Sequence, residues 1–116
     1  MIKAGVVGLG WWGQLLARSV TDSKKINITA GFTRTPANAS DFITETGINL
    51  YKEYEQLLND KNIDAIILAT PHSMHVEQIK LAAEHKKHIY VEKPIALTLK
   101  ETRTAIKAAR TAGVEI

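Results

Sequence analysis

The feature that most constrains this sequence is a glycine motif near the amino terminus, Gly8-Leu9-Gly10-Trp11-Trp12-Gly13. It follows an apolar run, Ile2–Val7, that predicts a strand, and it precedes a helical pattern. A chain that leaves a strand at Gly8 has to turn sharply, which a residue without a Cβ does at little cost. Gly10 would let the backbone approach a pyrophosphate, and Gly13 would let the helix lie against the sheet. In this strand–turn–helix setting the motif predicts a dinucleotide site at the amino terminus of a helix.

Strand and helix patterns alternate along the rest of the chain. Strands are expected at Ile2–Val7, Ile26–Thr33, Ile63–Ala69 and His88–Val91, and Val114–Ile116 has the pattern of a fifth strand beginning. Such alternation predicts an α/β fold with a Rossmann-type, doubly wound parallel sheet between two layers of helices.

The helices between these strands have recognisable ends. Pro36 should open a short helix that Gly47 closes, and Tyr54–Leu58 fits a helical turn. Thr98 and Glu101 form a capping-box pair that opens a last helix, which should end at Gly113. The residues expected on buried helical stripes are Trp12, Leu15, Leu16, Ser19 and Val20, then Val76, Ile79, Ala82 and Ala83, and finally Ala105, Ile106 and Ala109.

Length and composition fit one α/β domain covering residues 1–116. The chain has 116 residues, a net charge of +3 and lysines that are scattered or paired, so we expect no nucleic-acid partner. It has no cysteine, which is compatible with the cytoplasm, and no apolar run long enough to span a membrane. Because Val114–Ile116 looks like an unfinished strand, we expect the sequence to be the front piece of a longer protein whose substrate domain is absent here.

Three motifs together carry a family resemblance: the glycine motif, Thr70-Pro71-His72 with His75 behind it, and Glu92-Lys93-Pro94. In this order, with Asp64-Ala65-Ile66 and Ala96-Leu97-Thr98 beside them, they resemble the glucose–fructose oxidoreductase/inositol dehydrogenase (Gfo/Idh/MocA) family over nearly the whole chain. The resemblance implies an NAD(P)-dependent oxidoreductase acting on a sugar, polyol or related compound. It also implies a second domain that supplies substrate contacts and the interfaces of a homo-oligomer.

The resemblance assigns the chemistry to Lys93. In the family the matching lysine lies beside the nicotinamide and the reacting hydroxyl, where it can favour negative charge on that oxygen during hydride transfer. The resemblance also implies a cis Lys93-Pro94 bond. Glu92 is expected near the cofactor ribose or, alternatively, as a surface carboxylate. The cofactor contacts expected from motif and resemblance are Gly8, Gly10, Trp11, Trp12, Gly13, Thr33, Arg34, Thr70, Pro71, His72, His75, Glu92, Lys93 and Pro94.

Several of these residues have a second interpretation. The family often has asparagine where this chain has His72, and an imidazole can also donate a hydrogen bond at that position. His75 has a plain alternative as a packing residue in the first turn of a helix. His72 and His75 have no nearby carboxylate ligand, so we expect no metal site. One of Trp11 and Trp12 should anchor the helix in the core, while the other walls the nicotinamide pocket; the sequence does not say which is which.

The end of the second expected strand bears on the choice of cofactor. A carboxylate there holds the ribose 2′-hydroxyl of NAD, but this chain has Thr33 and Arg34, which favours NADP over NAD. The alternative is that Arg34 only stacks and that both cofactors bind alike. A non-catalytic dinucleotide-binding or sensing module is the alternative function. A short-chain type dehydrogenase is disfavoured because the sequence has no Tyr-x-x-x-Lys.

Overall fold

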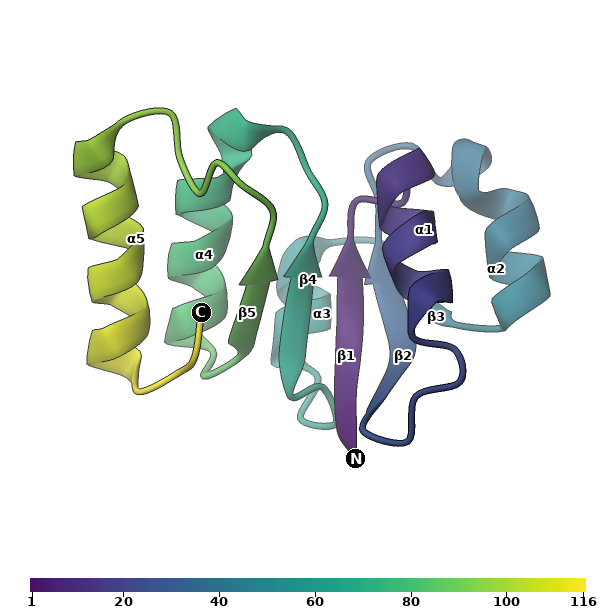
Figure 1. The fold of residues 1–116 in the computed structure, drawn as a ribbon. Coiled ribbons are helices and arrows are strands. Elements are labelled where there is room, and N and C mark those ends of the chain that lie inside the picture. The colour runs from purple at the N-terminus through teal and green to yellow at the C-terminus, as the bar shows by residue number, and fades with distance from the viewer.

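The computed structural model describes all residues from 1 to 116 and contains one parallel sheet flanked by helices (Figure 1). The strands are β1 (Ile2–Val7), β2 (Ile26–Phe32), β3 (Asn49–Tyr51), β4 (Ala65–Leu68) and β5 (His88–Val91). The helices are α1 (Trp11–Ser19), α2 (Ser40–Thr46), α3 (Tyr54–Asn59), α4 (His75–Glu84) and α5 (Leu99–Ala112), with 3-10 turns η1 (Pro36–Ala39) and η2 (His72–Met74).

The strands lie in the order β3-β2-β1-β4-β5, and every neighbouring pair is parallel. All strands therefore end at the same edge of the sheet, and Figure 1 shows the arrowheads of β1, β4 and β5 pointing to it. The order reverses direction at β1, where the chain first builds outward through β2 and β3 and then returns to add β4 and β5. This arrangement confirms the predicted doubly wound α/β fold.

Each face of the sheet has its own apolar core. The core shared with α1 and α2 contains Ala4, Val6, Leu9, Ala17, Ala39, Phe42, Ile48 and Ile67. The core under α3, α4 and α5 contains Val7, Ala30, Leu57, Leu58, Ile63, Ile66, Leu68, Ile79, Ala82, Ala83, Ile89 and Ala105. Alternate residues of β1 go to opposite cores, as the two-residue period of a strand requires. The sheet is thus held from both sides.

The strand expectations need three corrections. The edge strand β3 was not predicted, since it is only three residues long and opens with Asn49, which is a poor strand former. Val114–Ile116 is not a strand in the structure, although the Ile89 amide donates a hydrogen bond of 2.9 Å to the Glu115 carbonyl. The expected third strand is also shorter than predicted, because Ile63 belongs to the turn before β4.

The helix ends were predicted better than the buried stripe of the first helix. Gly47 and Gly113 both adopt the left-handed conformation that ends α2 and α5, and the Thr98 hydroxyl accepts a 3.1 Å hydrogen bond from the Glu101 amide. In α1, however, the fully buried residues are Gly13 and Ala17, and Trp12 and Leu15 are exposed. The helix packs so close to the sheet that its smallest side chains form the contact.

A buried lysine that the sequence analysis did not single out joins two segments at the edge of the sheet where β4 and β5 begin. Lys87, just before β5, is only 6% exposed, and its ammonium donates to the carbonyl oxygens of Asp60 (2.8 Å) and Ile63 (2.6 Å). Burial lowers the pKa of this ammonium, while the carboxylates of Asp60 and Asp64 oppose that effect. Lys87 thereby ties the turn that enters β4 to the strand beside it.

No helix of the structure combines the length and the apolar character that crossing a bilayer would require.

Candidate functional site

The carboxyl edge of the sheet brings together the four segments that carry the predicted site residues. These segments are the glycine motif after β1, residues 33–34 after β2, residues 70–72 after β4 and residues 92–94 after β5. In doubly wound sheets ligands bind at this edge, at the point where the strand order reverses. Here that point is β1, with β2 on one side and β4 on the other (Figure 1).

The glycine turn is locked between the two strands that flank β1. Gly8 has a φ of +92°, and its amide donates to the Phe32 carbonyl at 2.8 Å. A Cβ on Gly8 would lie 2.5 Å from the Ala69 carbonyl oxygen, and a Cβ on Gly13 would overlap the carbonyl oxygen of Gly8. Gly10 is different, because no atom lies within 4 Å of the position its Cβ would take. The first and last glycines are therefore needed by the fold, whereas Gly10 faces open space.

The amino terminus of α1 is free of protein partners. Gly10 is the capping residue and offers no side chain, and the first turn of α1 has no acidic residue. The first amides of a helix have no partner within it, so those of Trp11, Trp12 and Gly13 are available to an anion. This is the local structure that the glycine motif predicts.

Neither tryptophan is a core anchor, which corrects the expectation for one of them. Trp11 is 77% exposed and Trp12 is 40% exposed, and their ring centroids lie 5.6 Å apart. Gly13 and Ala17 take the buried positions of α1, so the indoles project from the helix start instead. Both indoles are thus exposed on the first residues of α1, directly after Gly10 in the chain.

The segment after β2 presents one exposed cation. Thr33 is buried, and its hydroxyl accepts a 3.3 Å hydrogen bond from the Thr35 amide. Arg34 is exposed and forms no ion pair; its guanidinium lies 3.5 Å from the Met74 sulfur. No carboxylate follows β2 at positions 33–35.

The segment after β4 is held by two buried polar side chains of α4. The Thr70 hydroxyl donates a short hydrogen bond of 2.5 Å to the side-chain oxygen of Gln78. His75 Nε2 lies 3.1 Å from the Thr70 carbonyl oxygen, and its Nδ1 lies 3.1 Å from the carbonyl oxygens of both Pro94 and Ile95. Both nitrogens face backbone carbonyl oxygens, and a neutral ring can donate its one N–H to only one of the two sides. Neither nitrogen is directed at open space, which fits the packing alternative for His75. The neighbouring Pro71 and His72 are exposed.

The segment after β5 carries an unpaired lysine. Lys93 is exposed and makes no hydrogen bond or ion pair within the chain, and its bond to Pro94 is cis, as expected. Glu92 accepts a 3.0 Å hydrogen bond from the Tyr90 hydroxyl, which raises the pKa of Tyr90. The structure thus leaves the Lys93 ammonium free to bind a partner that is not part of this chain.

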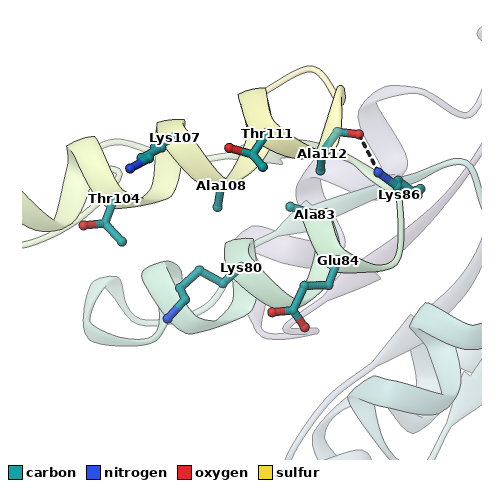
Figure 2. A pocket seen from close by; sticks show the side chains of 9 residues that line it. All are labelled: Lys80, Ala83, Glu84, Lys86, Thr104, Lys107, Ala108, Thr111 and Ala112. Carbon is teal, nitrogen blue, oxygen red and sulfur yellow. Dashed lines mark hydrogen bonds between the residues drawn. The ribbon is translucent and has the colours of Figure 1, made fainter.

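A separate crevice of about 460 Å³ lies between α4 and α5, and Figure 2 shows that both helices contribute to its lining. Its charged residues are Lys80, Glu84, Lys86 and Lys107, and the Lys86 ammonium donates to the Ala112 carbonyl at 2.9 Å. None of the predicted site residues lines this crevice. No cluster of three or more His, Cys, Asp or Glu side chains that could hold a metal ion is present.

Comparison with known proteins agrees with this geometry. The family model for the oxidoreductase family with an NAD-binding Rossmann fold (GFO_IDH_MocA) matches residues 2–116. The chain belongs to this family. The match covers the glycine turn, Thr70-Pro71-His72 and Glu92-Lys93-Pro94, which are the motifs on which the resemblance was based. The domain is therefore an NAD-binding Rossmann domain of the oxidoreductase type.

Individual relatives place the chain within a varied family. It is 36% identical over 114 residues to 2,7-anhydro-N-acetylneuraminate hydratase of Escherichia coli, covering 98% of this chain and 30% of that protein. It is 35% identical over 116 residues to scyllo-inositol 2-dehydrogenase (NAD(+)) of Bacillus subtilis, covering 97% and 34%. The crystal structure of biliverdin reductase with biliverdin and NADP+ from Synechocystis matches with a TM-score of 0.91 at 25% identity, covering 98% and 36%. The chain spans about a third of the length of these proteins.

Proposed function

We propose that the carboxyl edge of this domain binds a nicotinamide dinucleotide, with NADP(H) preferred over NAD(H). We further propose that the intact protein is an oxidoreductase acting on a CH–OH group of a sugar, polyol or related compound. The observation that carries the proposal is the placement of an open glycine turn and an unpaired lysine at the same edge of the sheet. The glycine turn suits the phosphates, and Lys93 suits the reacting oxygen.

The residues present fit the pyrophosphate. Gly10 leaves open space where a side chain would stand, and the free amides at the start of α1 can donate to phosphate oxygens. No carboxylate in the first turn of α1 would repel an anion. Exposed Trp11 and Trp12 offer aromatic surface beside the turn.

The preference for NADP(H) rests on the segment after β2. Arg34 is exposed and free of a carboxylate partner, so its guanidinium can form charge-assisted hydrogen bonds to a 2′-phosphate. The Thr33 hydroxyl already accepts the Thr35 amide, but it still has a proton to donate. An acidic residue at either position would instead favour the 2′-hydroxyl of NAD.

Bound nicotinamide would accept or deliver a hydride at its C4. The chain's own contribution to that chemistry is the Lys93 ammonium, which would donate a hydrogen bond to the substrate oxygen and favour negative charge on it. Thr70, Pro71 and His72 would line the nicotinamide side, and Glu92 would lie toward the ribose. The residues that recognise the substrate would come from the remaining two thirds of the length that the relatives have.

The intrinsic fluorescence of the chain tests this proposal directly. Trp11 and Trp12 are its only tryptophans, and both stand beside the glycine turn, so quenching by added NADPH or NADH reports on this site alone. We expect saturable quenching by both, with the lower Kd for NADPH. Arg34→Ala should remove most of the difference, with both titrations at one ionic strength because a phosphate contact is salt-dependent. Tighter binding of NADH by the unmodified chain would contradict the assignment of Thr33 and Arg34, and the absence of quenching and of calorimetric binding would contradict the proposal as a whole.

A further inference from the structure

His75 joins the segments that follow two neighbouring strands. Its ring is 1% exposed, and its nitrogens face the Thr70 carbonyl on one side and the carbonyls of Pro94 and Ile95 on the other, each at 3.1 Å. Thr70 follows β4, whereas Pro94 and Ile95 follow Lys93 after β5. A single side chain therefore bridges the two segments.

The segment that carries Lys93 has no other hydrogen-bonded support for its backbone. No backbone–backbone hydrogen bond involves residues 92–97, and the only side chain that bonds to their backbone is His75. Ala96 is buried and Ile95 packs against the core, but Lys93, Pro94 and Leu97 are exposed. The apolar contacts of Ile95 and Ala96 hold the segment against the core, and His75 is the only side chain that contacts its carbonyl oxygens.

The helix that carries His75, α4, is itself held in place by hydrogen bonds of Gln78. Gln78, one turn further along α4, is buried; its side-chain oxygen accepts the Thr70 hydroxyl, and its carbonyl accepts the Tyr54 hydroxyl at 2.8 Å. Two residues of one helix thus hold Thr70 from both its carbonyl and its hydroxyl. Apart from the apolar packing of Ile95 on the core, the imidazole is the one polar link from α4 to the Lys93 segment.

We propose that His75 is a positioning residue that sets the place of Lys93 relative to Thr70, so that the two sides of the nicotinamide end of the site keep a fixed separation. This inference rests on the proposed function for the role of Lys93, but the ordering of the segment by His75 can be measured without any ligand. In this role His75 touches neither the cofactor nor the substrate. It acts through the carbonyls of Pro94 and Ile95.

Three substitutions separate ordering by the ring from simple packing. His75→Asn keeps a donor near the place of Nδ1, toward Pro94 and Ile95, and His75→Gln keeps one near the place of Nε2, toward Thr70. His75→Leu keeps apolar bulk and removes both. His85→Asn is the matched control, because His85 Nδ1 bonds at 2.8 Å only to the Leu81 carbonyl of its own helix.

Amide ¹⁵N relaxation of the 116-residue chain measures the ordering. In the unmodified chain and in the Asn and His85 variants, the amides of Lys93, Ile95 and Ala96 should have order parameters near about 0.85, the value of rigid backbone. In the Leu and Gln variants they should fall below about 0.6, while the strand amides stay rigid. Rigid values in the Leu variant would overturn the proposal, and so would equal behaviour of the Asn and Gln variants. If the Leu variant does not fold, the Asn–Gln pair decides, and failure of the Asn variant to fold would also count against the proposal.

A binding measurement connects the ordering to function. Adenosine 2′,5′-bisphosphate reaches only the adenine side of the site, whereas NADPH also reaches Thr70 and Lys93. We expect the Leu variant to bind NADPH about 5- to 10-fold more weakly, the effect of one to two lost net hydrogen bonds, and to bind the bisphosphate unchanged. Equal weakening for both probes would overturn the positioning role. If the unmodified chain binds neither probe, the proposed function fails, and the relaxation experiment still decides the ordering by His75.

Discussion

Alanine substitutions in the glycine turn should separate the needs of the fold from the needs of the ligand. Gly8 and Gly10 are two residues apart but differ in surroundings. A Cβ on Gly8 would lie 2.5 Å from the Ala69 carbonyl oxygen, and the φ of +92° disfavours any side chain. Gly10 has a φ of −75° and open space at its Cβ position. Gly8→Ala should therefore lower the stability of the fold, whereas Gly10→Ala should leave stability nearly unchanged and weaken ligand binding.

The magnitudes follow from these surroundings. Gly8→Ala combines a left-handed backbone penalty of about 1–2 kcal/mol with an overpacking cost of about 1–3 kcal/mol. Since small domains are stable by only about 5–15 kcal/mol, this loss is a large fraction of the total. For Gly10→Ala, the gain of about 0.4–1 kcal/mol from a less flexible unfolded chain offsets a similar loss of capping preference. Its free energy of unfolding should stay within about 0.5 kcal/mol of the unmodified value.

For NADPH affinity the order should be the reverse of that for stability, so Gly10→Ala should be the more damaging substitution among variants that fold. A methyl group on Gly10 would occupy the space into which the pyrophosphate is proposed to fit, so NADPH should bind at least about tenfold more weakly, or about 1.4 kcal/mol. Denaturant unfolding gives the stability, and tryptophan quenching gives the affinity. Gly47→Ala is the control. Gly47 shares a positive φ (+67°) with Gly8 and open space at its Cβ position with Gly10, but it ends α2, away from the site. It should lose about 1 kcal/mol of stability and no affinity.

Unchanged NADPH affinity in Gly10→Ala would refute the placement of the pyrophosphate at this turn. A Gly8→Ala variant as stable as the unmodified chain would refute the steric reasoning.

Three further outcomes are expected. In the intact protein, Lys93→Ala should lower kcat about 100-fold while changing the cofactor Kd little, and an unchanged kcat in steady-state assays would make Lys93 a surface residue. The 116-residue chain should bind NADPH in calorimetry yet show no turnover over a panel of polyols, and robust turnover would contradict the need for a second domain. Burial raises the pKa of Tyr54 above its ordinary 10.0, so above pH 10 the unfolded chain loses a proton that the folded chain keeps. The free energy of unfolding should then fall by up to about 1.4 kcal/mol per pH unit. Tyr54→Phe should remove this pH-dependent decrease. If the variant's free energy of unfolding falls equally steeply above pH 10, Tyr54 is not the source of the decrease.

The sequence predicted the fold through its strongest patterns. The limits of β1 and β5, the carboxyl ends of α2 and α5 and the site edge all follow from apolar runs and glycine positions that act locally, whereas α2 itself begins at Ser40 after the 3-10 turn that Pro36 opens. The strand β3 was missed because a three-residue edge strand carries little local signal and owes its conformation to pairing with β2. Burial in α1 was mispredicted because its contact uses Gly13 and Ala17, whose small size weakens an apolar stripe.

The candidate site was predictable in its location and less so in its contacts. The residues after β1, β2, β4 and β5 meet because parallel strands end together, which the alternating pattern already implied. The placement of both His75 nitrogens against carbonyl oxygens could not be foreseen, since those carbonyls are up to 20 residues away. The same holds for Lys87, whose partners are carbonyls 24 and 27 residues away. A lysine between two strong apolar patterns was the only available signal for its burial.

The buried ammonium of Lys87 has a consequence for how this domain can diversify. It ties the turn before β4 to β5 at the amino ends of these strands, so part of the sheet's cohesion is secured at the edge opposite the site. The loops that follow the strands therefore contribute less to holding the strands together. Loops of different length and chemistry could be exchanged after β2 or β5 while the strands keep their register, as long as the lysine is retained. The domain is thus a scaffold in which the lysine contact lies at one edge of the sheet and the loops of the candidate site lie at the other.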